Sequence, residues 1–228
     1  MSGIYNTQLI AINPENPDPE HIRIAARTIR EGGVVVFPTQ CLYGLGADAR
    51  NAEAVARIFA IKRRASSNPL LILIQDRKDL TYLTDVVSLT AVTLMDAFWP
   101  GNITFLFEAK ASLPEGLTAG DGKIGVRLPG HPVARRLVLE AGGPITGTSA
   151  NLSGFPGCAR ISELVADIAR NVDLILDAGP LKGGIGSTIV DVTENPPVIV
   201  REGIIPAERI YQALSKPMLR SNAVRRSF

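Results

Sequence analysis

Residues 34–46 read VVVFPTQCLYGLG, and this stretch decides the fold. Its first four residues are apolar without alternation, which is typical of a strand that is buried on both faces near the centre of a sheet. The strand then runs into a turn that carries Thr39, Gln40 and two nearby glycines. Because glycine lets a ligand approach the backbone closely, we expect a ligand-binding loop at this end of the strand.

Helical and strand patterns flank this stretch on both sides without strict alternation. A helix begins at Asp18-Pro19 and stops at Gly32, with a capping carboxylate and proline in the first turn. Further helices are predicted at 51–62, 88–98, 132–141 and 162–170, the last capped by Ser162. Strands are predicted at 34–37, 70–74, 103–107, 124–128, 145–148, 174–176, 188–192 and 198–200. The order predicts an α/β domain with a twisted mixed sheet flanked by helices.

Composition narrows the class of protein. With 228 residues and 46% hydrophobic content, the chain is long enough for one large core and short for two independent domains. A net charge of +2 lacks the basic excess of a general nucleic-acid coat, so any positive field must be local. Cys41 and Cys158 lie far apart and outside metal-ligand spacing, which predicts no metal site. Without a signal peptide or a long apolar run, a reducing, cytoplasmic setting is expected.

Two cations stand at the mouth of a loop before a predicted strand. Lys62 continues the face of its helix that carries Ile58 and Phe59, so it is expected to face inward and to need an anionic partner. Arg64 follows two positions later. Together the two side chains can hold a phosphate chain, the ammonium of Lys62 as a point charge and the guanidinium of Arg64 as a two-pronged donor. The alternative is that Lys62 only ends the helix and complements its dipole.

Hydroxyl groups, glycines and strand arginines supply further candidates. Residues 146–154 include Ser149 and Asn151 among four hydroxyls, one amide and two glycines, and such a loop can present many donors to oxygen atoms. An ordinary capped turn uses the same residue types. Arg127 and Arg201 each lie at the end of a predicted strand, where the guanidinium fork suits a carboxylate, although strand arginines are often half-solvated.

Several common catalytic motifs are missing from the sequence. His21 and His131 have no plausible serine or cysteine nucleophile beside them, so both are interpreted as structural. The glycine-rich residues 179–188 lack the Gly-Lys-Ser/Thr ending of a Walker A loop, and no GxGxxG opens a helix after a strand.

Five segments together resemble the YrdC/Sua5 family, in the family's own order. They are residues 38–45 (PTQCLYGL), 62–64 with 68–70 (KRR and NPL), 127–132 (RLPGHP), 148–154 (TSANLSG) and 187–191 (STIVD). Each segment alone is weak evidence for the family, but five segments in the same order argue against a chance match. The resemblance covers residues 8–214 and implies a YrdC-like catalytic domain with a positively charged concave pocket.

The resemblance implies L-threonylcarbamoyladenylate synthase activity, a nucleotidyltransferase reaction of L-threonine, bicarbonate or CO2, and ATP with Mg²⁺. The product would serve the t6A modification of adenosine 37 in tRNA, through downstream threonylcarbamoyl transferase machinery. The implied catalytic residues are Lys62 and Arg64. The implied nucleotide-binding residues are Lys62, Arg64, Thr104, Ser149, Asn151 and Arg201, and the implied threonine-binding residues are Thr39, Asn68, Arg127 and Ser187. The family often has threonine where this chain has Cys41, so a hydroxyl contact there becomes a thiol contact.

The resemblance also suggests the short, single-domain form of the family, followed by a basic, mobile tail at 215–228 that could close over the pocket or contact RNA. The main alternative function is a non-catalytic factor of the same fold that binds tRNA or double-stranded RNA. A domain that handles carbamoyl phosphate is a weaker alternative, because two distant cysteines do not match its zinc-finger-like companion. A paralogue selective for another amino acid stays open.

Overall fold

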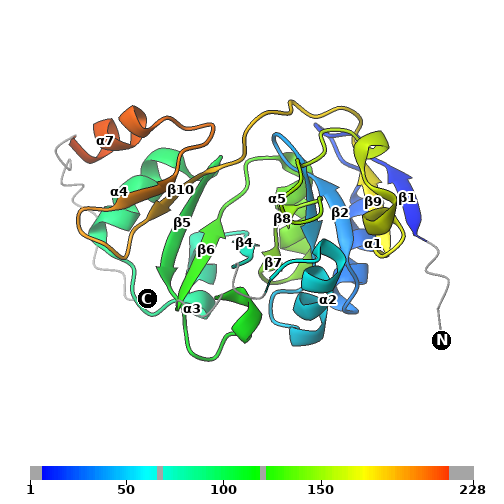
Figure 1. Cartoon of the computed structure of the whole chain (residues 1–228), viewed down its shortest axis with the longest axis horizontal. Helices are drawn as coiled ribbons and strands as arrows, with labels where there is room; N and C mark the ends of the chain where they lie inside the picture. The colour runs from blue at the N-terminus through cyan, green and yellow to red at the C-terminus, as the bar shows by residue number, and fades with distance from the viewer. Residues whose placement is uncertain (1–6, 66–68, 119–121, 216–228) are drawn as a thin grey trace.

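The structure is a computed structural model that describes residues 7–65, 69–118 and 122–215. Asn68 and the tail beyond Ser215, both singled out above, lie outside the described residues. The described chain is a mixed α/β fold with two sheets, as Figure 1 shows, and β1 (Gln8–Ala11) and α7 (Ala207–Ser215) lie at its opposite ends. The predicted α/β class is therefore confirmed, and the mixed sheet is divided in two.

The first sheet has the central strand that the opening stretch predicted. Its five strands lie in the order β1-β9-β2-β3-β8. Beyond β1 these are β9 (Leu174–Asp177), β2 (Val35–Pro38), β3 (Tyr43–Gly46) and β8 (Thr148–Ser149). β2 pairs in parallel with β9 and antiparallel with β3. All four of its residues are buried, as expected for a continuous apolar run at the centre of a sheet.

The second sheet has six strands in the order β11-β10-β5-β6-β4-β7. They are β11 (Val198–Arg201), β10 (Thr188–Asp191), β5 (Ile103–Glu108), β6 (Lys123–Arg127), β4 (Leu71–Leu73) and β7 (Ile145–Thr146). β10 and β5 run parallel, as do β4 and β6, whereas the other neighbours are antiparallel. The carboxyl end of β6 therefore carries Arg127 to the same edge as the end of β4.

Strand β3 was not predicted, because glycine normally weakens a strand. Here Gly46 faces the ring of Phe37 on β2, and a Cβ at this glycine would lie 2.8 Å from Phe37 Cε1. The ring fills the space that a side chain would need, so the two strands can pair closely. The turn between them then carries Thr39 and Gln40.

The chain changes sheets at Gly147. The sequence predicted one strand over 145–148, but the structure splits it into β7 in the second sheet and β8 in the first. The Gly147 amide donates to Leu71 O at 2.7 Å. A Cβ at Gly147 would lie 2.5 Å from Leu73 Cγ, so only glycine fits without displacing β4.

Helices cover the sheets. They are α1 (Pro19–Arg30), α2 (Ala52–Lys62), α3 (Leu80–Leu83), α4 (Leu89–Phe98), α5 (Pro132–Ala141), α6 (Ala166–Ala169) and α7. α1 packs against α5, and both bury apolar residues with β2 and β9 in one cluster. α4 packs against α7 beside the second sheet. Within the described ranges, none of these helices combines the length and the apolar character needed to cross a bilayer.

The helix predicted at 162–170 is shorter than expected. Ile161–Glu163 is a single 3-10 turn, and α6 begins only after Val165. Ser162 is not its cap. The Glu163 carboxylate instead accepts the amides of Ala159 and Arg160 at 2.9 and 3.3 Å, which ties this turn backward and separates it from α6.

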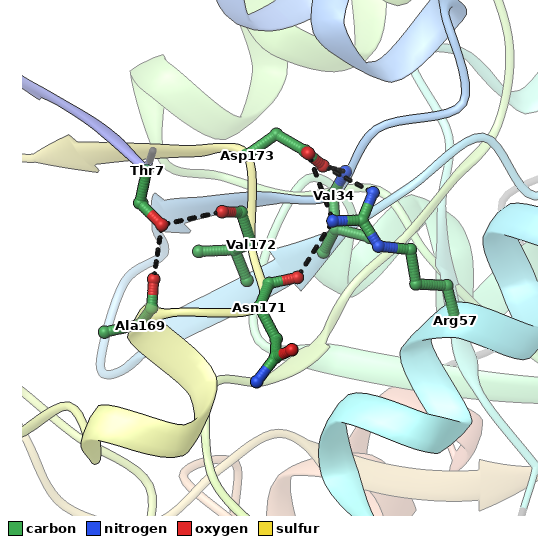
Figure 2. Close-up of polar contacts among 7 residues, drawn as sticks. All are labelled: Thr7, Val34, Arg57, Ala169, Asn171, Val172 and Asp173. Atoms are coloured by element: carbon green, nitrogen blue, oxygen red, sulfur yellow. Dashed lines mark hydrogen bonds and ion pairs between the residues drawn. The ribbon is translucent and has the colours of Figure 1, made fainter. Parts of the chain in front are cut away.

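An ion pair fastens α2 to the starts of the neighbouring strands β9 and β2 (Figure 2). Asp173 accepts the Val34 amide and also binds Arg57, with Nη1 2.7 Å from Oδ2 and Nη2 3.0 Å from Oδ1. Arg57 Nη2 donates in addition to Asn171 O at 2.9 Å. Both partners are about a quarter exposed, so this bidentate pair is screened less than a fully exposed one.

We expect Asp173→Ala to lower the free energy of unfolding by about 2 kcal/mol, because it leaves the Val34 amide without its acceptor and removes the carboxylate partner of Arg57. Urea denaturation followed by circular dichroism measures the change. Arg23→Ala is the matched control, since the Arg23–Glu20 pair is largely exposed and should be worth less than about 0.5 kcal/mol. Equal effects of the two substitutions would contradict the role given to Asp173.

Candidate active site

A cavity of about 320 Å³ lies between the two sheets. The first sheet lines it through Tyr43, Gly44, Thr148 and Ser149, and the second through residues on β4, β5, β6, β10 and β11. The turn after β2 adds Thr39, Cys41 and Leu42. The cavity therefore meets the loop that the opening stretch predicted.

The charges of the lining are of one sign. Arg64, Arg127 and Arg201 line the cavity, and no aspartate or glutamate is among the described residues of its wall. A cavity lined by cations without carboxylates favours an anionic ligand.

Arg127 is the most deeply buried of these cations, with 7% of its surface exposed. Its Nε donates to Gly101 O at 2.7 Å, and its Nη2 donates to Gln40 Oε1 at 2.7 Å and to Asn102 Oδ1. These acceptors are all neutral. Burial lowers the pKa of Arg127 to about 10, so the group keeps its charge at neutral pH. Its remaining nitrogen, Nη1, has no partner among the described residues.

A pair of buried hydroxyl groups forms another part of the wall. Thr104 Oγ1 and Ser187 Oγ lie 2.9 Å apart, and Arg201 Nη2 donates to Ser187 O at 2.8 Å. The resemblance assigned Thr104 and Arg201 to the nucleotide and Ser187 to threonine. The structure joins all three residues in one part of the wall.

Thr39 and Arg64 also lie in the wall, each with a local backbone contact. Thr39 Oγ1 donates to Leu42 O at 2.6 Å, which fixes the turn after β2. Arg64 Nη2 donates to Pro69 O at 2.9 Å, and burial lowers the pKa of Arg64.

The structure places Lys62 differently from the predicted phosphate contact. Its side chain is only 1% exposed and is not part of the described lining. Nζ donates to Ser149 O and, at 2.7 Å, to Asn151 O, while the Ser153 amide donates to Lys62 O at 2.9 Å. Lys62 thus holds the 149–153 segment from behind the cavity wall. Burial, with the nearby charge of Arg64, lowers the pKa of Lys62 to about 8.

Asn151 is likewise turned away from the lining. Its Nδ2 donates to Leu152 O and Phe155 O at 2.8 and 2.6 Å, and its buried Oδ1 has no partner among the described atoms. Of the predicted pair, only Ser149 reaches the cavity.

Sequence reasoning did not single out Asn102 or Gln40, which hold Arg127, and it interpreted His131 as structural. The structure gives His131 a structural role at the cap of α5, where Nδ1 accepts the Val133 amide at 3.3 Å, and also places it in the cavity wall. The pattern Gly-His-Pro directly before a helix signals the cap but not the cavity. Burial lowers the pKa of His131, so its ring is neutral at pH 7.

The donor set does not suit a resident metal ion. The described residues contain no cluster of three or more histidine, cysteine or carboxylate side chains that could hold one. Mg²⁺ prefers oxygen ligands in octahedral geometry, and the described cavity wall provides no carboxylates.

Comparison with known proteins gives a consistent result. The sequence family Sua5_yciO_yrdC, described as Telomere recombination, matches residues 27–203. A threonylcarbamoyl-AMP synthase from Bacillus subtilis is 41% identical over 194 residues, which cover 85% of this chain and 56% of the relative. The chain spans 57% of a second curated synthase, from Pyrococcus abyssi, so it matches little more than half the length of these relatives.

Two solved structures are similar throughout the described fold. The crystal structure of P. abyssi Sua5 complexed with L-threonine has a TM-score of 0.87 at 37% identity, and the match covers 92% of this chain and 61% of that one. The crystal structure of E. coli YciO has a TM-score of 0.81 at 31% identity, covering 90% of this chain and 99% of that one.

Proposed function

The chain belongs to the Sua5/YciO/YrdC family, and we propose that it is an L-threonylcarbamoyladenylate synthase. It would join L-threonine, bicarbonate or CO2, and ATP into threonylcarbamoyl-AMP and pyrophosphate. The observation that carries this proposal is the cavity between the sheets, in which three guanidinium groups meet hydroxyl groups without a carboxylate in the described wall. The L-threonine complex of P. abyssi Sua5 supports the choice of amino acid.

We assign the threonine carboxylate to Arg127. Its charge is buried and its three described acceptors are neutral, so an anionic ligand would compensate a charge that the fold leaves unbalanced. Thr39, with its proton used by Leu42 O, can accept a hydrogen bond from the threonine amine or hydroxyl. We also propose the threonine contact that the resemblance implies for Asn68.

We assign the phosphates of ATP to Arg64 and Arg201, which are both in the wall. Ser149 and the Thr104–Ser187 pair supply hydroxyl groups beside them. Lys62 and Asn151 would act indirectly, since both brace the 149–153 segment that presents Ser149. Any Mg²⁺ would arrive with ATP and be held by phosphate oxygens and water, because the described wall offers no carboxylate.

The reaction needs positioning more than covalent help from the protein. The neutral amine of threonine adds to CO2 to give a carbamate and releases a proton. A carbamate oxygen then attacks the α-phosphorus of ATP, and the bond to pyrophosphate breaks. Holding both reactants in one cavity supplies the alignment, and the guanidinium groups neutralise charge that develops on the phosphates. The product would serve t6A modification of tRNA through a downstream transferase.

We expect purified protein to release pyrophosphate from ATP in the presence of Mg²⁺, bicarbonate and L-threonine. Release with L-serine should be slower, and release without an amino acid should be at background. The measurement is coupled pyrophosphate detection, with the full chain. Equal release with every amino acid would point to a different substrate. No release from protein that binds RNA in a salt-dependent manner would favour the RNA-binding alternative.

A further inference from the structure

The carboxylate of the amino-acid substrate needs more donors than Arg127 provides. A carboxylate has about four lone-pair sites on its two oxygens, and a guanidinium can bind both oxygens only if two of its nitrogens are free. In this protein Nε and Nη2 of Arg127 are already bound to Gly101, Gln40 and Asn102. With the described residues alone considered, Nη1 is the nitrogen left to face a ligand, so the usual two-nitrogen clamp is not available.

The hydroxyl group of Thr39, the residue before Gln40, cannot supply the second donor to the carboxylate. The Oγ1 proton of Thr39 is donated to Leu42 O at 2.6 Å, so this hydroxyl can only accept from a ligand. A second donor can come from elsewhere in the wall, and besides the Ser187 hydroxyl the imidazole of His131 is available there.

His131 lies in the wall close to Arg127 along the chain, and Gln40 links the two positions. Gln40 Oε1 accepts from Arg127 Nη2 at 2.7 Å. Its Nε2 packs so closely on Gly130 that a Cβ there would lie 2.7 Å away. The residue directly before His131 thus touches the same amide that orients Arg127.

The cap of α5 determines which nitrogen of His131 is available. Nδ1 accepts the Val133 amide at 3.3 Å, so in the neutral ring the proton is on Nε2. Because burial keeps the ring neutral at pH 7, His131 has one fixed donor and no free acceptor there. A neutral N–H donor suits a carboxylate oxygen and cannot serve as a general base.

We propose that His131 is a substrate-binding residue, whose Nε2–H donates to the amino-acid carboxylate beside Arg127 Nη1. The inference rests on the proposed synthase function and adds a contact to it. His131 would then have two roles at once, since one nitrogen caps α5 and the other binds the substrate.

Two substitutions separate these roles. Asparagine is a favoured N-cap, so His131→Asn should keep the cap through its amide oxygen and lose the more distant donor. Glutamine can place its amide N–H near the position of Nε2, so His131→Gln should keep the donor and lose the cap. The measurements are Tm and the steady-state parameters for L-threonine in the full chain, with pyrophosphate release as the readout.

We expect His131→Asn to keep Tm within a few degrees and to lower kcat/KM for L-threonine by about 10- to 100-fold, the usual effect of losing a hydrogen bond to a charged group. The KM for ATP should change less than threefold. His131→Gln should lower Tm and keep kcat/KM within about fivefold of the parent. The reverse pattern, with the Asn variant fully active and the Gln variant impaired in kcat/KM for L-threonine, would overturn the proposal.

The parent protein distinguishes this failure from failure of the proposed function. If the parent releases pyrophosphate with L-threonine and His131→Asn does so equally well, only the role of His131 is wrong. If the parent neither releases pyrophosphate nor binds L-threonine in isothermal titration calorimetry, the synthase function is wrong and the assignment of His131 is overturned with it.

Discussion

Arg127→Met should reduce threonine-dependent pyrophosphate release by about 30- to 4,000-fold, the largest loss of activity expected for a single substitution in this protein. The guanidinium is buried among neutral acceptors, and losing a buried charge contact to a ligand costs about 2–5 kcal/mol. The loss should appear mainly as a higher KM for L-threonine, measured by pyrophosphate release, with the Kd for ATP nearly unchanged.

Arg127→Lys should be almost as poor. An ammonium retains the charge but cannot bind Gly101, Gln40 and Asn102 while also reaching a ligand. The control is Arg23→Met, which removes an exposed arginine of α1 and should leave turnover unchanged. If Arg127→Met weakened ATP and threonine binding equally, the residue would serve the shape of the whole cavity and not the carboxylate.

Lys62→Met should change how stability depends on pH. The folded protein holds the pKa of Lys62 at about 8, against an ordinary value of 10.5. Between these two pH values the unfolded chain binds a proton that the folded chain does not, so stability rises with pH. The stabilisation is complete above pH 10.5 and is lost as pH falls through 8. The full difference corresponds to about 3 kcal/mol.

Guanidinium denaturation at pH 7.5, 8.5, 9.5 and 10.5 tests this. The parent should gain about 3 kcal/mol relative to Lys62→Met across the series, because titrating groups that do not interact with Lys62 contribute equally to both proteins. The raised pKa of Tyr43, for example, lowers the stability of both at high pH and cancels in the difference. A difference that stayed constant with pH would mean that Lys62 titrates normally in the folded state.

The sequence predicted residue types at the site better than their placement. Arg127 could be singled out at the end of a predicted strand and Ser149 in a hydroxyl-rich loop, whereas Thr104 came only from the family resemblance; all three line the cavity. The placement of Lys62 depends on the backbone carbonyls of residues 149 and 151, which helical periodicity does not reveal. An inward lysine was correctly predicted, but the expected anionic partner is a pair of carbonyl oxygens.

Local sequence patterns also predicted most of the helices and strands, but they missed features that depend on residues far away in the sequence. The capping residues Asp18, Asn51 and Ser88 start helices as predicted, because capping acts within one turn. The strand β3 was missed because its glycines are explained only by the Phe37 ring opposite. The division into two sheets was missed because a single run, 145–148, contributes to both.

That division has a mechanical consequence. The strands β7 and β8 belong to different sheets, yet only Gly147 separates them, and its amide is tied to Leu71 of the second sheet. The distance between the two sheets is therefore fixed at this point of the molecule. The Thr146 amide also donates to Ala47 O, and its hydroxyl binds Ala47 N and Leu45 O, so this junction ties the two sheets together both by covalent chain and by hydrogen bonds.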